Sequence, residues 1–350
     1  MTENPPEPPR RPTVLYTVAW SVFALVGFVA IGAPAQLSQP AWGIWFSEII
    51  VFAGLAVAGY QIIGLRPLRA MGIQRFDARA FGLGLVAGVL NYVAWVIPLG
   101  AAAEAIFPKE LRDRFDQSLL FDQASSLEVA IIVAAVSVAA PLGEELIYRG
   151  FLQRGLAIHI KAPWAIAVTA AVFAISHQSP VTLVPLFELG ALFGLLAWRA
   201  GSVWPAIAAH GASNLLASSI FFLASDTTGN ENGVPWSAAL GALLLGNAAL
   251  FGFLRFAWNR LPVKEPMDFV EQPPRLPSVA LFPWAVAGLV AIGLLLAVDR
   301  RGVQLNWLDA VKLRPSKELR AREDVRELRA KARRGEVPLE DYEAKVKSLK

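Results

Sequence analysis

The sequence contains no cysteine, only three histidines and few charged residues, since Asp, Glu, Lys and Arg make up 17% of its 350 positions. Without cysteine, the chain cannot form a disulfide, a thiolate metal site or a cysteine nucleophile. The low charge accompanies a hydrophobic content of 55% and a mean hydropathy of +0.48. These values exclude an ordinary soluble globule and indicate a membrane protein.

Long apolar runs recur along most of the chain. About 20 apolar residues are needed for a helix to cross roughly 30 Å of hydrocarbon. The runs that approach this length are 14–33, 42–64, 81–103, 127–157, 162–178, 182–198, 203–223, 236–258 and 279–298. The first run is too long for a removable signal peptide and lacks its small-residue cleavage site. The sequence therefore predicts an all-α, polytopic transmembrane bundle of eight or nine helices, with the lipid bilayer as its partner.

Composition divides the chain into five parts. We expect a disordered Pro-rich leader (1–12), N-terminal transmembrane helices (13–126), a core that carries the polar motifs (127–223), C-terminal transmembrane helices (224–298) and a charged helical tail (299–350). The net charge of +4 comes from this tail, because 15 of the 32 basic and 10 of the 28 acidic residues follow Val298. The remaining body is nearly neutral, which argues against nucleic acid as a partner.

Basic residues also predict the orientation of the chain. Arg10 and Arg11 adjoin the first run, and the loop around 64–80 carries four arginines, whereas the hairpin 33–43 carries no Lys or Arg. The positive-inside rule then places the N-terminus in the cytoplasm, and we expect a bacterial plasma membrane. The same rule favours a cytoplasmic tail, but nine spans would place the tail on the opposite side. A re-entrant or peripheral segment is one resolution of this conflict.

The tail contains two short helical patterns separated by Gly335 and Pro338. Glycine suits a helix C-terminus and proline a first helical position. Residues 318–350 resemble the small helical hairpin called the short C-terminal (SHOCT) domain; a generic amphipathic tail is the alternative.

Ionisable side chains in apolar runs cost at least about 2.5 to 3.5 kcal/mol each on insertion scales, so they persist mainly where paired or functional. Glu144, Glu145 and Arg149 lie in one such run. Because residues four apart share a helix face, Glu145 is the expected ion-pair partner of Arg149, and Glu144 faces elsewhere. Glu48 and Asn91 are expected to form interhelical polar contacts.

In two further clusters a histidine lies one helical turn from another notable side chain. Phe173 precedes His177 by one turn, and Asn214 follows His210 by one turn. The third histidine, His159, lies in a polar turn. Singly, each cluster can be structural, as a core histidine or an interhelical hydrogen bond. Counted along their helices, however, all can reach one layer of the membrane. A carboxylate, two imidazoles and a carboxamide in one polar cavity could activate water and stabilise an oxyanion.

The motifs EELIYRG, FAISH and HGASN, in this order, resemble those of the CAAX prenyl protease type II family, also called the CPBP or ABI family. The resemblance covers roughly Leu127 to Leu223. It departs from the usual family pattern at Tyr148, where phenylalanine is common.

The resemblance implies an intramembrane endopeptidase that acts on a membrane-anchored or prenylated-like peptide. It implies that Glu144 is the general base for water, that His177 holds this water, and that His210 and Asn214 stabilise the oxyanion. Glu145 and Arg149 would support the helix. Tyr148, Phe173 and Glu188 are candidates for the substrate groove, with an interhelical hydrogen bond as the alternative for Glu188.

Family members are often described as metalloproteases, and Glu144, His177 and His210 could supply three zinc ligands. The H-E-x-x-H spacing is absent, however, and a water activated by glutamate alone requires no metal. We expect no tightly bound metal. Two other functions remain open: a non-catalytic membrane scaffold or bacteriocin-immunity protein of the same fold, and a transporter, since intramembrane Glu and His also serve transport.

Overall fold

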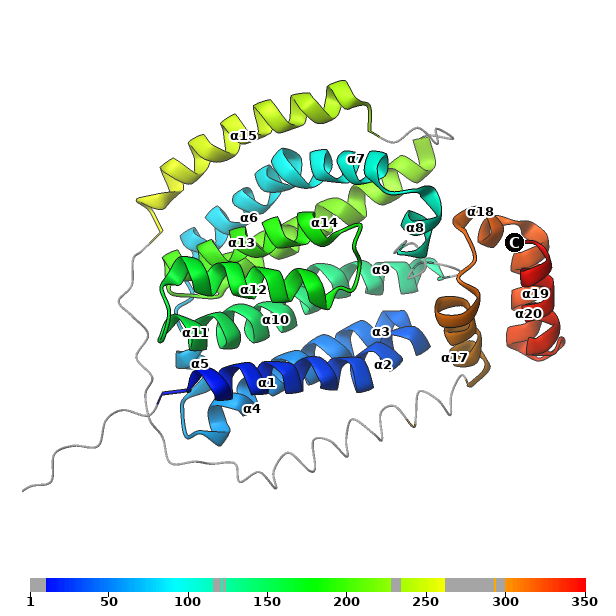
Figure 1. Cartoon of the computed structure of the whole chain (residues 1–350), viewed down its shortest axis with the longest axis horizontal. Coiled ribbons are helices and arrows are strands. Elements are labelled where there is room, and N and C mark those ends of the chain that lie inside the picture. Colours follow the sequence, from blue (N-terminus) through cyan, green and yellow to red (C-terminus); the bar gives the residue numbers. More distant parts are fainter. Residues whose placement is uncertain (1–10, 116–120, 122–123, 228–233, 262–292, 294–299) are drawn as a thin grey trace, which may run out of the picture.

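The computed structural model of the protein describes residues 11–115, 121, 124–227, 234–261, 293 and 300–350, and their regular elements are all helices. The predicted all-α bundle is therefore confirmed. Most of the predicted leader (1–12) and of the ninth apolar run (279–298) lies outside the described residues. In Figure 1, the helices of the bundle lie side by side, and the C-terminal tail packs at one end.

Six helices in the described part are long and apolar enough to cross a membrane. They are Val14–Ser38, Pro40–Ile62, Ala78–Ile106, Ser126–Ala157, Leu183–Ala200 and Trp236–Trp258. A shorter apolar helix, α12 (Ala162–Ser176), and the 24-residue α14 (Trp204–Thr227) complete the bundle. The helices correspond to the first eight apolar runs, so the chain is an integral membrane protein.

Four of the long helices include π-helical turns and consist of consecutive elements. These are α1 (Val14–Gly27), η1 (Phe28–Gly32) and α2 (Ala33–Ser38); α3 (Pro40–Trp45), η2 (Phe46–Ala53) and α4 (Gly54–Ile62); α6 (Ala78–Asn91), η3 (Tyr92–Val96) and α7 (Ile97–Ile106); and α9 (Ser126–Ala134), η5 (Ala135–Ala139), α10 (Ala140–Glu145), η6 (Leu146–Gln153) and α11 (Arg154–Ala157). The other bundle helices are α5 (Pro67–Ala70), α8 (Lys109–Arg114), α13 (Leu183–Ala200) and α15 (Trp236–Trp258).

The hairpin expected over 33–43 is almost entirely helical, and only Gln39 breaks the helix. Pro40 is the first residue of α3, where a missing N–H leaves no hydrogen bond unmade, whereas Pro34 lies inside the continuous helix Val14–Ser38. The turn is tight because a Cβ at Gly43 would lie 2.2 Å from the Ala35 carbonyl oxygen. The first span, Val14–Ser38, is therefore longer than the run 14–33, whereas the second, Pro40–Ile62, has the length of the run 42–64 and begins two residues earlier.

The helices that carry the predicted motifs occupy the centre of the bundle. In Figure 1, α10 to α14 lie between α1–α4 on one side and α6, α7 and α15 on the other. The packing of α6 on α14 is especially close, because Cβ atoms at Gly84 and Gly88 would lie 2.3 Å and 2.2 Å from the carbonyl oxygens of Pro205 and Ala209. Small residues allow such close helix contacts in membranes. This packing fixes α14, which carries His210, within the bundle.

The tail folds into five short helical elements: α17 (Arg300–Trp307), η8 (Leu308–Leu313), α18 (Lys317–Ala321), α19 (Glu323–Arg334) and α20 (Leu339–Ser348). As the pattern indicated, α19 ends at Gly335, which has the left-handed φ of 84°. Pro338 lies one position before the first residue of α20. The predicted helical hairpin is thus present, whereas its SHOCT-like character remains a prediction.

Buried Asp309 joins the elements of the tail. Its two carboxylate oxygens accept hydrogen bonds from Arg329 Nε at 2.7 Å and from the Tyr342 hydroxyl at 2.8 Å. Arg329 also donates to the Asn306 side chain at 2.7 Å. A buried carboxylate with several donors is stable only while those donors are present. One acidic side chain therefore connects η8 with both helices of the hairpin.

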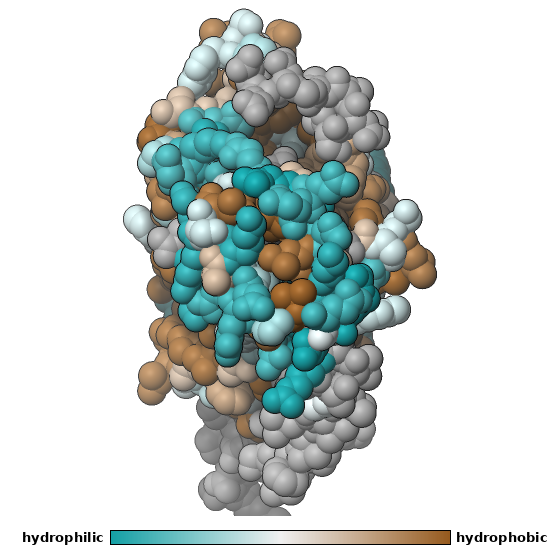
Figure 2. Space-filling model, turned by 90° about the vertical axis from the view of Figure 1, so that its right-hand side faces the viewer, coloured by the Kyte–Doolittle hydropathy of each residue, from teal (hydrophilic) through white to brown (hydrophobic). Residues whose placement is uncertain are grey.

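The tail packs at the end of the bundle where the first helix finishes, opposite the end where it starts. Asn306 donates to the Ser38 carbonyl oxygen at 3.2 Å, and Lys109 forms an ion pair with Glu318. We refer to these ends as the Ser38 end and the Val14 end. If Val14–Ser38 crosses the membrane, Val14 and the tail lie on opposite sides of it, which is at odds with a cytoplasmic location for both; the side on which each lies stays a prediction. Figure 2 views the Ser38 end, where hydrophilic tail residues lie in front of the hydrophobic helices.

We expect Gly88→Ala to destabilise the bundle by about 1 to 3 kcal/mol, because the added methyl group would overlap the Ala209 carbonyl. Gly82→Ala in the same helix is the matched control, since a Cβ there meets nothing within 4 Å. It should be neutral or stabilising by up to about 1 kcal/mol. Thermal unfolding in detergent measures both, and equal melting temperatures for the two variants would contradict the packing described.

We expect Asp309→Ala to destabilise the tail by about 3 to 5 kcal/mol, because Arg329 would remain partly buried without its carboxylate. Limited proteolysis should then cleave within 300–350 faster than in the wild type. Asp341→Ala removes an exposed carboxylate from the same hairpin and should leave the cleavage rate unchanged.

Candidate active site

The helix from Ser126 to Ala157 positions both glutamates of the first motif. It begins with a capping box in which Ser125 and Glu128 bond each other's backbone N–H groups. Glu144 and Glu145 end α10, directly before the π-helical η6. Such π-helical turns are frequent at functional sites because they change which side chains share a face. Here Glu145 is fully buried, whereas the Glu144 side chain keeps 14% of its surface exposed.

The expected ion pair between Glu145 and Arg149 is present and fully buried. Arg149 Nη1 donates to Glu145 Oε1 at 2.8 Å, and Arg149 Nη2 donates to the Gly190 carbonyl oxygen on α13 at 2.8 Å. The guanidinium carbon also lies 4.7 Å from the centre of the Phe173 ring on α12. Hydrogen bonds and aromatic contact offset the cost of burying both charges. The pair thus holds the helix Ser126–Ala157, which we call the glutamate helix, against α12 and α13.

His210 lies between the two glutamates. Its Nδ1 is 2.9 Å from Glu145 Oε1, and its Nε2 is 3.7 Å from Glu144 Oε2. Because an ionised carboxylate only accepts hydrogen bonds, the contact with Glu145 places a proton on Nδ1 and directs Nε2 toward Glu144. The ring stacks on Phe193, with centroids 4.8 Å apart. Two side chains that lie 66 residues apart in sequence, Glu144 and His210, thereby meet in the bundle.

His177 lies at the C-terminus of α12, where the chain turns toward α13. Its Nδ1 is 2.8 Å from the Phe173 carbonyl oxygen, and its ring packs edge-on against Phe173, with centroids 4.8 Å apart. Phe173 also contacts the ring of His210 at 6.0 Å. The structure thus links His177 to His210 through one shared aromatic ring.

Asn214 lies one turn beyond His210 on α14. Its Nδ2 donates to the Val136 carbonyl oxygen in η5 at 2.7 Å. This bond holds α14 to the glutamate helix and uses one of the two N–H groups of the amide. The second N–H group remains for another acceptor.

The three residues assigned to a substrate groove have different surroundings. Tyr148 and Phe173 pack edge-on at 5.2 Å, and the Tyr148 hydroxyl donates to Ser176 at 2.7 Å. Glu188 accepts a hydrogen bond from Asn91 Nδ2 at 2.8 Å, which is the interhelical contact named as its alternative. Tyr148 and Phe173 are buried in the aromatic core next to the site.

Glu48 is a further carboxylate near the site, and sequence reasoning assigned it only to interhelical polar contact. A Cβ at Gly143 would lie 2.8 Å from Glu48 Oε2, and the carboxylates of Glu48 and Glu144 are close enough to interact electrostatically. Glu48 is 2% exposed. The signal in the sequence was its occurrence in an apolar run, but nothing in the sequence indicated that it lies beside Glu144.

The zinc-ligand set suggested for Glu144, His177 and His210 stays a prediction. In the part of the chain that the structure describes, no three His, Asp or Glu side chains are grouped to hold a metal ion. His210 directs one nitrogen to Glu145, and His177 directs one to a backbone carbonyl. Such bonds at one ring nitrogen leave the other nitrogen of each histidine available, as is usual for metal-binding histidines.

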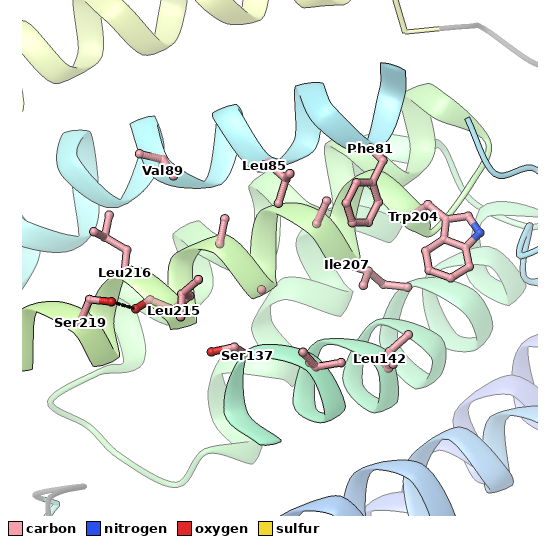
Figure 3. Close-up of a pocket in the computed structure, with 14 residues that line it drawn as sticks. Phe81, Leu85, Val89, Ser137, Leu142, Trp204, Ile207, Leu215, Leu216 and Ser219 are labelled. Carbon is pink, nitrogen blue, oxygen red and sulfur yellow. Dashed lines mark hydrogen bonds between the residues drawn. The ribbon is translucent and has the colours of Figure 1, made fainter. Parts of the chain in front are cut away.

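An apolar groove of 610 Å³ adjoins the site between α6, α14 and the glutamate helix. Figure 3 shows its side chains, with Phe81, Leu85 and Val89 on α6 facing Ile207 and Leu215 on α14. Leu142 and Gly211 also line it, and they are close in sequence to Glu144 and His210. The groove could accommodate a hydrocarbon chain or an apolar peptide segment beside the polar cluster.

Comparison with known families identifies the same part of the chain. Residues 126–216 match the family described as type II CAAX prenyl endopeptidase Rce1-like. The matched segment includes all three motifs and confirms the family resemblance drawn from them. No curated protein and no solved structure matches the chain. The family is a protease family, which supports a membrane-embedded hydrolase with a peptide substrate.

We expect Arg149→Lys to destabilise the bundle by about 1 to 3 kcal/mol, because one ammonium group cannot replace both guanidinium hydrogen bonds. Arg255→Lys, on the exposed last turn of α15, is the matched control and should have no effect. Thermal unfolding in detergent compares the two. Identical melting temperatures would show that Glu145 and Gly190 do not depend on the guanidinium.

Proposed function

We propose that the chain is an intramembrane endopeptidase that hydrolyses a peptide bond of a membrane-associated protein or peptide. The observation that carries the proposal is the position of His210 between Glu144 and the Glu145–Arg149 pair, within the segment that matches the protease family. Two helices, Ser126–Ala157 and α14, contribute these side chains, and the cluster lies in the apolar interior of the bundle.

In the proposed reaction, Glu144 accepts a proton from a water molecule as the water oxygen attacks the substrate carbonyl. Water is a weak nucleophile at neutral pH, so a positioned base accelerates this step. His177 helps to hold the water. When both ring nitrogens of His210 carry protons, Nε2–H can donate to the oxyanion, together with the second N–H of Asn214.

The tetrahedral intermediate then collapses. The C–N bond breaks, and the proton held by Glu144 passes to the departing amine, so that Glu144 is regenerated. Glu145 accepts the Nδ1–H of His210 throughout and keeps the ring oriented, while Arg149 compensates its charge. These roles account for two adjacent carboxylates with different surroundings.

The apolar groove supports a substrate that carries a hydrophobic anchor or membrane-embedded segment. It holds 610 Å³ beside Leu142 and Gly211, so an anchor within it would bring the adjoining peptide to the polar cluster. The orientation proposed from charge places the Val14 end in the cytoplasm, because Arg66, Arg69 and Arg75 lie there. The tail then lies on the opposite side of the membrane.

We expect Glu144→Gln to lower the cleavage rate by about 10²- to 10⁴-fold, because the amide cannot accept the proton from water. Purified wild type and variant would be compared on a panel of membrane-anchored peptides by mass spectrometry, with and without chelator. Glu104→Gln, which removes an exposed carboxylate on α7, is the control and should cleave like the wild type.

Equal cleavage by Glu144→Gln and wild type would remove Glu144 from the mechanism. Loss of activity in chelator would show that a metal takes part. A wild type that cleaves no peptide of the panel, while remaining folded, would favour the non-catalytic scaffold over the protease.

A further inference from the structure

A row of polar side chains crosses the apolar interior from the end of α2 toward Glu144. Gln36 Nε2 donates to Ser47 Oγ at 2.7 Å and lies 3.4 Å from Glu48 Oε1. Ser47 Oγ in turn donates to the Ile44 carbonyl oxygen at 3.0 Å and lies 3.4 Å from the same Glu48 oxygen. Ser47 is 0% and Glu48 2% exposed. Polar side chains inside a membrane bundle are costly, so a row of three, Gln36, Ser47 and Glu48, requires a structural or functional reason.

The inner end of this row adjoins the proposed base. Glu48 Oε2 and Glu144 Oε2 are both buried, and neither accepts a hydrogen bond from any residue that the structure describes. Leaving such an acceptor without a donor costs about 1 to 3 kcal/mol. Gly143 allows Glu48 to approach the glutamate helix closely, since a Cβ there would lie 2.8 Å from Glu48 Oε2. Two buried carboxylate oxygens without donors are acceptors that a water molecule could satisfy.

The outer end of the row opens into a second pocket, at the Ser38 end of the bundle. Gln36 lines this pocket, whose volume is 270 Å³, together with residues of the tail. Because one buried water requires roughly 10 to 15 Å³ of such space, the pocket can hold several. Its polar lining residues are Gln36, Ser38, Gln39, Glu128, Asn306, Asp309, Arg329 and Arg333. The row therefore begins at a pocket beneath the tail that has several polar side chains in its lining.

The apolar groove is a poorer route for water. Its lining is almost entirely hydrocarbon, and its two serines are Ser137 and Ser219. The Ser219 hydroxyl donates to the Leu215 carbonyl of its own helix (Figure 3). A water molecule requires two to four polar partners to be stable inside a protein. Hydrocarbon walls do not supply them, whereas Gln36, Ser47 and Glu48 do.

We infer that water reaches Glu144 from the pocket beneath the tail, along Gln36, Ser47 and Glu48. Glu48 is then a positioning residue, which holds the last water of the route against Glu144 without touching substrate. The inference rests on the proposed function for the role of Glu144. The route itself can be tested without catalysis, because it predicts that water reaches a side chain in the middle of the row.

The absence of cysteine makes a labelling test direct, since any introduced thiol is the sole one. We expect Ser47→Cys to react with methyl methanethiosulfonate at least about tenfold faster than Ser21→Cys, because a thiol in contact with water ionises more readily. Ser21 is the matched control: it is also a buried serine in the first hairpin, and its hydroxyl donates to the Thr17 carbonyl. Equal labelling rates for the two cysteines would overturn the route.

Two substitutions at Glu48 distinguish whether catalysis requires a polar side chain at this position or a charged one. Glu48→Leu should lower kcat by about 10- to 100-fold with KM unchanged, whereas Glu48→Gln, which can still bond water, should stay within about threefold of the wild type. Equal kcat for Glu48→Leu and wild type, or equal loss in both variants, overturns the inference. Melting temperatures establish that both variants are folded.

The outcomes also separate this inference from the proposed function. If Glu144→Gln cleaves normally while Ser47→Cys labels rapidly, the route is supported and the role of Glu144 fails. If Glu144→Gln is inactive while Ser47→Cys reacts as slowly as Ser21→Cys, the protease proposal is supported and the route is overturned.

Discussion

The buried ion pair of Glu145 and Arg149 is the interaction on which the candidate site depends. Neither charge has access to solvent, so each requires the other and the additional bonds from Gly190 and His210. Those bonds come from α13 and α14, while Phe173 on α12 covers the guanidinium. One charge pair therefore determines how four helices meet. The same pair orients the imidazole of His210 toward Glu144, so helix assembly and site geometry have a common cause.

Placed beside this pair, Glu144 has a different environment from its neighbour in sequence. Glu145 Oε1 accepts hydrogen bonds from two donors, whereas Glu144 Oε2 has His210 Nε2 at 3.7 Å and a second carboxylate, Glu48, nearby. Carboxylates with distinct surroundings can perform distinct tasks, one structural and one chemical. The adjacent apolar groove then offers a path for a hydrophobic substrate segment. The polar row from Gln36 offers a separate path for water.

Much of this arrangement could be predicted from the sequence, because it depends on local periodicity. Apolar run length indicated the six long apolar helices of the described part as well as α12 and α14, and the four-residue spacing indicated the Glu145–Arg149 pair. The contact of His210 with both glutamates was harder to predict. Sequence spacing indicates how deep a residue lies in the membrane, but not how one helix is rotated against another. Glu48 was assigned only to polar packing for the same reason. Its position beside Gly143 depends on how η2 crosses α10, which composition does not encode.

The crossing at Gly143 also limits which parts of the bundle can separate. A Cβ there would lie 2.4 Å from the Glu48 carbonyl oxygen, so the two backbones touch without side chains between them. The first hairpin and the glutamate helix must therefore move as a unit, and their contact cannot open without disturbing Glu144. On the opposite face, toward α6 and α14, flexible side chains line the boundary. The backbones of α6 and α14 also touch, at Gly84 and Gly88, so access to the groove depends on its side chains and not on separation of these helices.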